Sequence, residues 1–308
     1  MARKVNKLAM LLKRETTEGT DAVPTAAANA IKAKNITYTP IDGEDVPTDF
    51  ILPWLGHQGV DLAGKFASIE FEVELSGAGA AGTAPAWGAA MRACGVTETI
   101  TASTKVEYEP NSEGTDSCSI YFNDDGIKQV ILGAKGTVQL QMPAKKVPTL
   151  KFKMIGLLGT FSDAALPAVT TTAWIKGLVA EKGITTFSID AYEAALENLA
   201  IDFGMKAELR SLVNITRIDV TDRKSTGTAV IEQPLLATWN PYAKVLSRAR
   251  MALAVQHGVT AGNIVKIDAD AVELGKPTQG QSQGNRTTSL PLYFVPTAGD
   301  DEWKITVQ

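Results

Sequence analysis

The strongest chemical motif in the sequence is Gly77-Ala-Gly79-Ala-Ala-Gly82, which has the spacing of a dinucleotide-binding loop. It follows a predicted strand and precedes a predicted helix, the context in which such glycines let a backbone approach a pyrophosphate. The strand before it alternates apolar residues with Glu70, Glu72 and Glu74, whereas the strand of a nucleotide-binding sheet is apolar on both faces. Its carboxylates would also repel a pyrophosphate. The motif is therefore predicted to be a flexible connecting loop without a cofactor.

The other candidate groups do not assemble into a catalytic or metal site. His57 and His257 lack the carboxylate or cysteine spacing of a triad or a metal centre, and they are predicted to be surface or core residues. Asp124-Asp-Gly126 and Asp300-Asp301 are predicted to form turns, and Asp268-Ala-Asp270 lies on a predicted strand, without the spacing of a calcium loop. The sequence therefore predicts no catalytic, cofactor-binding or metal-binding residue, and an enzyme is the weakest interpretation.

Composition limits the class of protein. The chain has 308 residues, enough for two domains, and its 44% hydrophobic and 21% charged residues lie in the globular range. A formal net charge of −4 disfavours a protein that binds DNA by neutralising phosphates. Cys94 and Cys118 fit a reducing compartment without a disulfide. No apolar run is long enough to span a bilayer, and Leu8–Leu12 is too short for a signal-peptide core.

Period-two patterns predict a mainly β fold. The clearest strands are Ile36–Tyr38, Phe66–Leu75, Val106–Glu109, Ser119–Phe122, Thr137–Met142 and Leu150–Ile155. In the second of these, the glutamates all point to the face opposite the apolar residues, so that face is predicted to be wet. A short helix is predicted at Pro85–Cys94, because proline suits a first helical position and Gly95 can take the left-handed conformation after the end.

The second half repeats this order of elements. Asn198–Ile201 matches Asn35–Tyr38 with an offset of 163 (198 − 35), and Thr226–Leu235 matches the strand ending at Leu75 with an offset of 160 (235 − 75). A second helix is predicted at Pro241–Arg250, after the N-cap residue Asn240. A shared order with slowly falling offsets indicates a duplicated domain, and the alternative is a chance resemblance between β segments.

Four segments follow from this repeat: an N-terminal arm (1–30) with little to fold around by itself, a first β domain (31–158), a flexible connector (159–183) and a second β domain (184–308). Each domain is expected to be a β-sandwich or β-barrel with one short helix. Each closes with a long hairpin, over Thr137–Ile155 in the first and Ala271–Val295 in the second, whose tip at Gly275–Gly284 is predicted to be loose.

Three segments in this order resemble the tail tube (major tail) proteins of long-tailed, non-contractile bacteriophages. They are Glu15–Pro24, Gly82–Trp87 leading into Met91–Gly95, and Pro296–Asp301 before a final strand. The resemblance covers nearly the whole chain. It implies a structural virion protein with no catalytic residues, which stacks as rings into a hollow tube for genome delivery. Some members of that family carry two such domains, in agreement with the repeat.

The resemblance also implies partners and a location. The protein is expected to bind itself and the tape-measure, tail-terminator and tail-tip proteins, to let double-stranded DNA pass without specific binding, and to bind no membrane. It would assemble in the host cytoplasm and remain in the virion tail. The alternative is a β-sandwich decoration or receptor-binding protein on the virion surface, which would bind a glycan or a host protein.

Two sets of residues are candidates for the assembly. Like charge on the wall would keep DNA from sticking, so some of Glu70, Glu72, Glu74 and Glu232 are candidates for the lumen, and the alternative is that they pair with Lys151 and Lys153 on a solvated outer sheet. Pro40–Gly64 is predicted to be a long loop, mobile in the monomer, that docks on the adjacent ring with Gly204–Ser225 as its counterpart. The docking candidates are Ile51, Leu52, Pro53, Trp54, Leu55, Arg210 and Leu212.

Each ring is predicted to contain three chains and to have pseudo-sixfold symmetry. The resemblance implies that single-domain members form rings of six domains. A chain with two such domains should therefore form a ring of the same bore with three copies. A flexible connector of about 25 residues would span roughly 25 to 30 Å, enough to join neighbouring domains. The competing arrangement has six chains per ring, with the second domain projecting outward.

Overall fold

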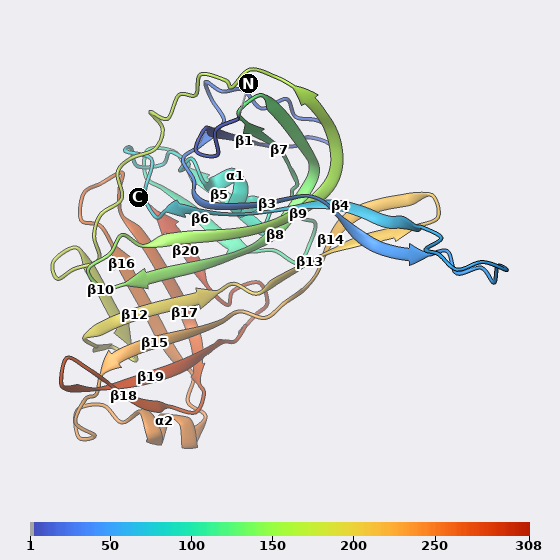
Figure 1. Cartoon of the computed structure of the whole chain (residues 1–308). Coiled ribbons are helices and arrows are strands. Elements are labelled where there is room, and N and C mark those ends of the chain that lie inside the picture. The colour runs from blue at the N-terminus through green and yellow to red at the C-terminus, as the bar shows by residue number, and fades with distance from the viewer. Residues whose placement is uncertain (1–2) are drawn as a thin grey trace.

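Two layers of antiparallel strands make up most of the protein in the computed structural model, which describes residues 3–308 (Figure 1). The strands of the first half are β1 (Leu8–Arg14), β2 (Ala30–Ile31), β3 (Lys34–Pro47), β4 (Val60–Glu74), β5 (Val96–Thr101), β6 (Lys105–Pro110), β7 (Cys118–Asp124), β8 (Ile127–Pro143) and β9 (Thr149–Asp163). Those of the second half are β10 (Thr185–Ile189), β11 (Tyr192–Glu193), β12 (Leu196–Asp202), β13 (Met205–Leu212), β14 (Ile215–Arg223), β15 (Thr226–Glu232), β16 (Met251–His257), β17 (Val265–Leu274), β18 (Thr278–Ser282), β19 (Asn285–Phe294) and β20 (Lys304–Val307).

The front layer is a continuous run of eight paired strands in the order β3–β4–β9–β8–β12–β15–β19–β18. Figure 1 shows them stacked from β3 to β18, with β16 and β17 crossing behind at a steep angle. The back layer has the order β10–β16–β17–β20–β6–β5. The long strands β8 and β9 also pair beyond the front layer, because register shifts between Gln129 and Lys135 bend them toward β7 and β1.

The two halves of the chain share both layers. Strand β8 of the first half pairs with β12 of the second, a contact that we call the front seam, and β20 pairs with β6, which we call the back seam. One hydrophobic cluster runs through both halves, with the stacked pair Phe71 and Phe152 in the first and the pair Phe203 and Trp303 in the second. The apolar faces of the two halves are therefore buried in one continuous core.

The mainly β prediction is confirmed, and all six strands predicted in the first half are present. In β4, Ile69, Phe71 and Val73 are buried while the glutamates between them stay partly exposed, which is the predicted alternation. The strand is therefore wet on one face and packed on the other.

Both predicted helices are present but shorter than expected. Helix α1 is Gly88–Arg92 rather than Pro85–Cys94, and the residue before it, Trp87, provides no side-chain cap. Helix α2 is Pro241–Ser247, and the Asn240 side chain accepts a hydrogen bond from the Ala243 N–H, as the N-cap prediction requires. It ends early because Arg248 takes the left-handed conformation, with φ of 51°.

The same strand pairings occur in both halves. The pairings β3–β4, β4–β9, β9–β8 and β5–β6 correspond to β12–β15, β15–β19, β19–β18 and β16–β17. The two predicted offsets, 163 and 160, cannot both hold. Tyr38 pairs with Ile69, and the two offsets carry these residues onto Ile201 and Ala229. Ile201 should then pair with Ala229, but it pairs with Gly227. One of the two matches is therefore displaced by two residues.

Two segments expected to be loose, the N-terminal arm and the tip of the second long hairpin, are ordered by contacts with the rest of the chain. In the N-terminal arm, β1 pairs with β7, and the buried Glu15 carboxylate accepts hydrogen bonds from Ser117, Ser119 and the Gly133 N–H. The predicted hairpin tip at 275–284 contains β18, which pairs with β19. Those two predictions of loose structure are wrong, because contacts from distant parts of the chain hold each segment.

The connector is also held in place. Its first residues, to Asp163, belong to β9, and the buried Trp174 donates its indole N–H to the Ala30 carbonyl at 2.8 Å. Backbone hydrogen bonds join Ala180 to Lys145 and Lys146. The connector therefore runs along the chain's own first half, and its description as a flexible coil is wrong.

Candidate assembly surfaces

The front layer turns a polar face away from the core. Residues opposite one another in a sheet share a face, and the register connects Glu72, Lys151, Gln139, Asp202 and Thr226 across β4, β9, β8, β12 and β15. Alternation along β4 and β15 adds the remaining members. The polar face therefore contains all four glutamates predicted for the lumen, Glu70, Glu72, Glu74 and Glu232, together with Thr137, Gln141, Asn198 and Lys153.

The charge on this polar face is mixed rather than purely acidic. Glu70 lies 3.2 Å from the Lys151 ammonium and 3.3 Å from that of Lys153, the pairing considered as the alternative from the sequence. Burial opposes ionisation of Glu70, but the hydrogen bonds and charges of these lysines lower its pKa. Glu72 accepts a hydrogen bond from Asn35, and Glu74 lies 3.8 Å from Lys34. Charge on the face is thus partly neutralised inside the chain.

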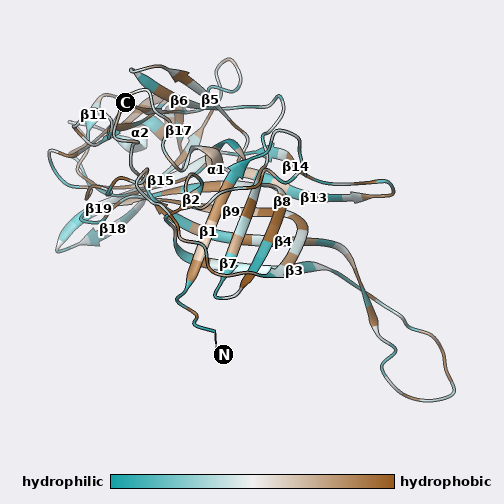
Figure 2. Ribbon diagram, turned by 90° about the horizontal axis from the view of Figure 1, so that it is seen from above, coloured by the Kyte–Doolittle hydropathy of each residue, from teal (hydrophilic) through white to brown (hydrophobic). Residues whose placement is uncertain are grey.

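Two hairpins project from the same side of the body (Figures 1 and 2). The first hairpin is the outer part of β3 and β4, which stay paired out to Pro47 and Val60. The prediction of a long loop over Pro40–Gly64 is therefore wrong: only 48–59 form the tip. The second hairpin, β13–β14, occupies the predicted counterpart at Gly204–Ser225 and ends in a tight turn. Most residues in the outer parts of both ribbons are polar or exposed, so their pattern did not indicate strands, although the second hairpin buries Met205 and Ile218 near its base.

The tips of both hairpins expose large apolar side chains. In the first, Ile51 and Leu55 are fully exposed, Trp54 is 66% exposed, and Leu52 and Pro53 are also exposed. In the second, Val213 is 91% exposed, and Leu212 and Arg210 are exposed near it. The candidates predicted for docking in the two segments thus lie at or near the tips of two hairpins. Phe50, Val213 and Ile215 are exposed as well and were not among those candidates.

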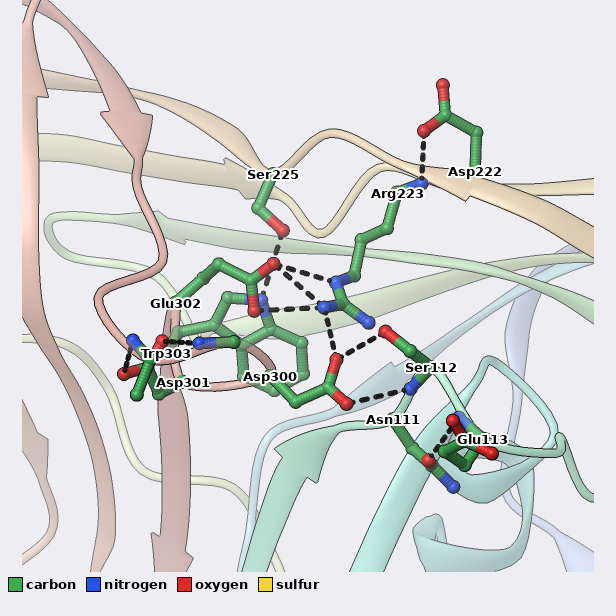
Figure 3. A network of polar contacts seen from close by, with 12 residues as sticks. Asn111, Ser112, Glu113, Asp222, Arg223, Ser225, Asp300, Asp301, Glu302 and Trp303 are labelled. Atoms are coloured by element: carbon green, nitrogen blue, oxygen red, sulfur yellow. Dashed lines mark hydrogen bonds and ion pairs between the residues drawn. The ribbon is translucent and has the colours of Figure 1, made fainter.

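A buried ionic network fixes the base of the second hairpin (Figure 3). Arg223, the last residue of β14, donates to Glu302 at 2.8 Å and to Asp300 at 2.7 Å, and Asp300 accepts hydrogen bonds from the hydroxyl and the N–H of Ser112. Next to it, Ser225 accepts a hydrogen bond from the Trp303 indole. The network joins the first half, the second hairpin and the C-terminal segment, and no spacing in the sequence indicates it.

The charges in this network support one another. Burial alone would lower the pKa of Arg223, but hydrogen bonds to Asp300 and Glu302 raise it above its ordinary value. Burial would raise the pKa of Asp300, but its hydrogen bonds from Ser112 and Arg223 lower it. The stabilisation from Asp300 is therefore present at neutral pH, above its unfolded pKa of about 4, and is lost as the pH falls through the lower folded value.

Replacing Arg223 by methionine is expected to destabilise the protein by on the order of 2 kcal/mol, because Glu302 would remain mostly buried without its counter-charge. Urea unfolding at pH 7 measures this. The control is Lys224→Met, because the Lys224 side chain is 81% exposed and its pair with Asp222 contributes little. The difference between wild type and Arg223→Met should shrink as the pH falls below about 4, because Asp300, whose pKa Arg223 helps to lower, is then protonated. Equal stability of the two variants at pH 7 would contradict this role of the network.

The glycine-rich segment has a packing role rather than a loose one. A Cβ at Gly77 would lie 2.1 Å from the Gly262 carbonyl oxygen, and the Gly79 N–H donates to that same oxygen. The Gly77 N–H also donates to the Asn263 side chain. The segment is therefore tied to the turn before β17, and the prediction of a flexible loop is wrong. These glycines allow two backbones to touch, a use that their spacing alone does not distinguish from phosphate binding.

The histidines and cysteines occupy ordinary structural positions. His57 lies exposed in the tip of the first hairpin, and His257 is buried on β16, where burial lowers its pKa and favours the neutral ring. Cys94 and Cys118 are buried free thiols, and burial raises the pKa of each. Within residues 3–308, no group of three or more acidic, histidine or cysteine side chains could hold a metal ion.

Comparison with known families decides what these surfaces belong to. The family model of the phage tail tube protein matches residues 6–294, which is nearly the whole chain. The chain belongs to the phage tail tube protein family. The resemblance drawn from the loop motifs is thereby confirmed, and the protein is a structural component of the phage tail. A comparison with curated proteins gave no match.

A tail tube protein works through contacts with other tail proteins. Family membership therefore makes the polar face, the outermost strands of the front layer and the hairpin tips candidates for such contacts. None of the helices in the described part of this tail tube protein is long and apolar enough to cross a membrane. The surfaces described above are the candidates for those contacts.

Proposed function

We propose that this tail tube protein forms rings of three chains that stack into a hollow tube, through which double-stranded DNA passes without specific binding. Its other partners are the tape-measure, tail-terminator and tail-tip proteins. Assembly takes place in the host cytoplasm, and the tube remains in the virion. The observation that carries the proposal is the front layer, a run of eight paired strands whose two similar halves join at the front seam.

A ring of three follows from the number of strands that each chain contributes. Three copies of the front layer supply 24 strands. With strands about 4.8 Å apart and tilted by about 40°, a closed barrel of this size has a backbone diameter of roughly 48 Å. Side chains on the inner face reduce that bore but leave room for a duplex. Because each chain contributes two similar four-stranded units, the ring has threefold symmetry and approximates sixfold symmetry.

The front seam also argues against six chains per ring with an outward second domain. In that arrangement the second half would not continue the strand layer of the first. Here β12, β15, β19 and β18 extend the layer directly from β8. The duplicated unit therefore supplies matching strands in both halves, and both belong to the wall of the tube.

Cryo-microscopy of the concentrated protein tests the proposal. Tubes with three chains per ring are expected, in which averaging with threefold symmetry resolves the halves as different. Well-resolved halves under true sixfold averaging would rule out the trimeric ring. Isolated particles that bind a glycan array would instead support a decoration or receptor-binding protein.

The polar face is proposed to line the lumen, and thiol labelling tests this assignment. A Glu72→Cys variant should react with a small maleimide in tubes, but a maleimide on a large polyethylene glycol should label it only in the monomer. Glu72 is a suitable position because it makes no ion pair with a lysine or arginine at the front layer. The control is Glu113→Cys, in an exposed loop away from the polar face. Equal labelling of both variants by the large reagent in tubes would place Glu72 on the outside.

A further inference from the structure

We propose that neighbouring chains in a ring join by antiparallel pairing of β18 in one chain with β3 in the next, with Thr278 opposite Thr39 and Gly280 opposite Thr37. This inference rests on the proposed ring and adds to it the strands, the direction and the register of the contact between chains. Its occupant is a second copy of this chain.

The two strands that the proposal joins are the free edges of the front layer. Among the described residues, β18 pairs only with β19, and the inner part of β3 pairs only with β4. They lie at opposite ends of the layer (Figure 1). Thr37, Thr278 and Gly280 are exposed there. Such an edge presents unpaired backbone N–H and C=O groups that another strand can bind.

The front seam shows how the repeated unit joins itself. Each half arranges its strands in the same order, so β8 occupies in the first half the edge that β18 occupies in the second, and β12 corresponds to β3. Inside the chain, β8 pairs with β12 in an antiparallel manner. The equivalent contact at the ends of the chain is β18 with β3, and a single chain cannot make it because those edges lie far apart. A second copy can.

The register between chains is found by matching each strand of the first half, residue by residue, with the equivalent strand of the second half. Asn35-Ile-Thr-Tyr38 and Asn198-Leu-Ala-Ile201 match residue by residue, which places Thr37 on Ala200. Thr37 pairs with Glu70 and Ala200 with Thr228, so Glu70 corresponds to Thr228.

The next two strands complete the correspondence. Glu70 pairs with Lys153 and Thr228 with Pro291, which places the buried Phe152 and Met154 on the buried Leu290 and Leu292. The same shift places Lys151 on Ser289. Because these residues pair with Gln139 and Thr278 respectively, Gln139 corresponds to Thr278.

The front seam then fixes the contact between chains. Gln139 pairs with Asp202 and Gln141 with Ala200. The counterparts of Gln139 and Asp202 are Thr278 and Thr39, which therefore lie opposite one another between chains. The counterparts of Gln141 and Ala200 are Gly280 and Thr37, which form the second pair.

The prolines beside these strands agree with this register. Pro40 follows Thr39, and Pro277 precedes Thr278, so antiparallel pairing places the two prolines opposite one another, just beyond the last pair. Proline cannot donate a backbone hydrogen bond, and a sheet tolerates it where pairing ends. A register shifted by four residues, with Thr39 opposite Ser282, would place Pro40 inside the pairing. The proposed contact also sets small polar side chains opposite one another and no like charges.

Disulfide cross-linking of assembled tubes tests the register. Residues directly opposite in antiparallel strands have Cα atoms about 4.5 to 5.5 Å apart, within the range that a disulfide spans. The double variant Thr39→Cys/Thr278→Cys should therefore form covalent dimers and trimers on mild oxidation, with the trimer as the largest product. Thr37→Cys/Gly280→Cys is a second pair for the same register. The native cysteines are buried and do not compete.

The matched control is Thr37→Cys/Thr278→Cys, which lies on the same face but two residues out of register, at about 7 to 8 Å. It should stay monomeric on a non-reducing gel. Intact tubes without cross-links in both in-register variants, or efficient cross-linking of Thr39→Cys/Ser282→Cys instead, would overturn the register and leave the proposed function standing. Failure of the unmodified protein to form rings or tubes would overturn the proposed function and this contact with it.

Discussion

Replacing Trp54 and Leu55 by serine is expected to abolish tube growth while leaving the fold of the chain intact. Leu55 is fully exposed and Trp54 is 66% exposed in the monomer, so their replacement removes no packing inside the chain. Burying each such side chain against an adjacent ring would contribute about 1.5 to 3 kcal/mol. A proposed ring of three chains would carry three copies of this tip, so the loss would repeat at each copy. Negative-stain microscopy and sedimentation should show rings or monomers in place of tubes.

A matched control separates docking from a general loss of surface hydrophobicity. Leu235→Ser/Leu246→Ser removes two side chains that are 79% and 86% exposed, close to α2 rather than at the hairpin tips. Urea unfolding of both double variants should differ from that of wild type by less than about 0.5 kcal/mol per substitution. Tubes of normal length from the tip variant, or their loss from the control alone, would contradict docking through the first hairpin.

Replacing Phe152 by alanine is expected to destabilise the whole chain by about 3 to 5 kcal/mol, because it opens a cavity in the core. Phe152 is fully buried and its ring stacks on Phe71 at 5.2 Å between centroids. Since one core runs through both halves and two seams join them, the loss should shift a single unfolding transition. Circular dichroism during urea unfolding follows the strands of both halves.

The control for this prediction is Phe161→Ala in the same strand, β9, where the side chain is 46% exposed and its loss should cost far less. A Phe152→Ala protein with two separate transitions, of which only the first is shifted, would show that the halves unfold independently. That result would contradict the continuous core as the unit of folding.

Composition and period-two patterns were enough to predict the class of fold and the alternation of buried and exposed residues along strands. In β4, apolar residues at every second position have only one way to be buried in a pleated strand, so the wet face of the glutamates was predictable. Asn240 and Pro241 likewise fixed the start of α2 through local hydrogen bonding. The order of loop motifs was enough to indicate the family. Each of these features depends on residues that are close together in the chain.

Contacts between distant parts of the chain set which segments are ordered and which surfaces are continuous. Glu15, Trp174 and Arg223 each find partners on distant parts of the chain, so nothing near them in the sequence showed that the arm, the connector and the second hairpin would be fixed. Strands β3 and β4 stay paired beyond Pro40, because backbone hydrogen bonds of a ribbon need no apolar pattern. The single polar face exists because β8 pairs with β12, and register between remote strands is set by packing of the whole sheet rather than by either strand alone.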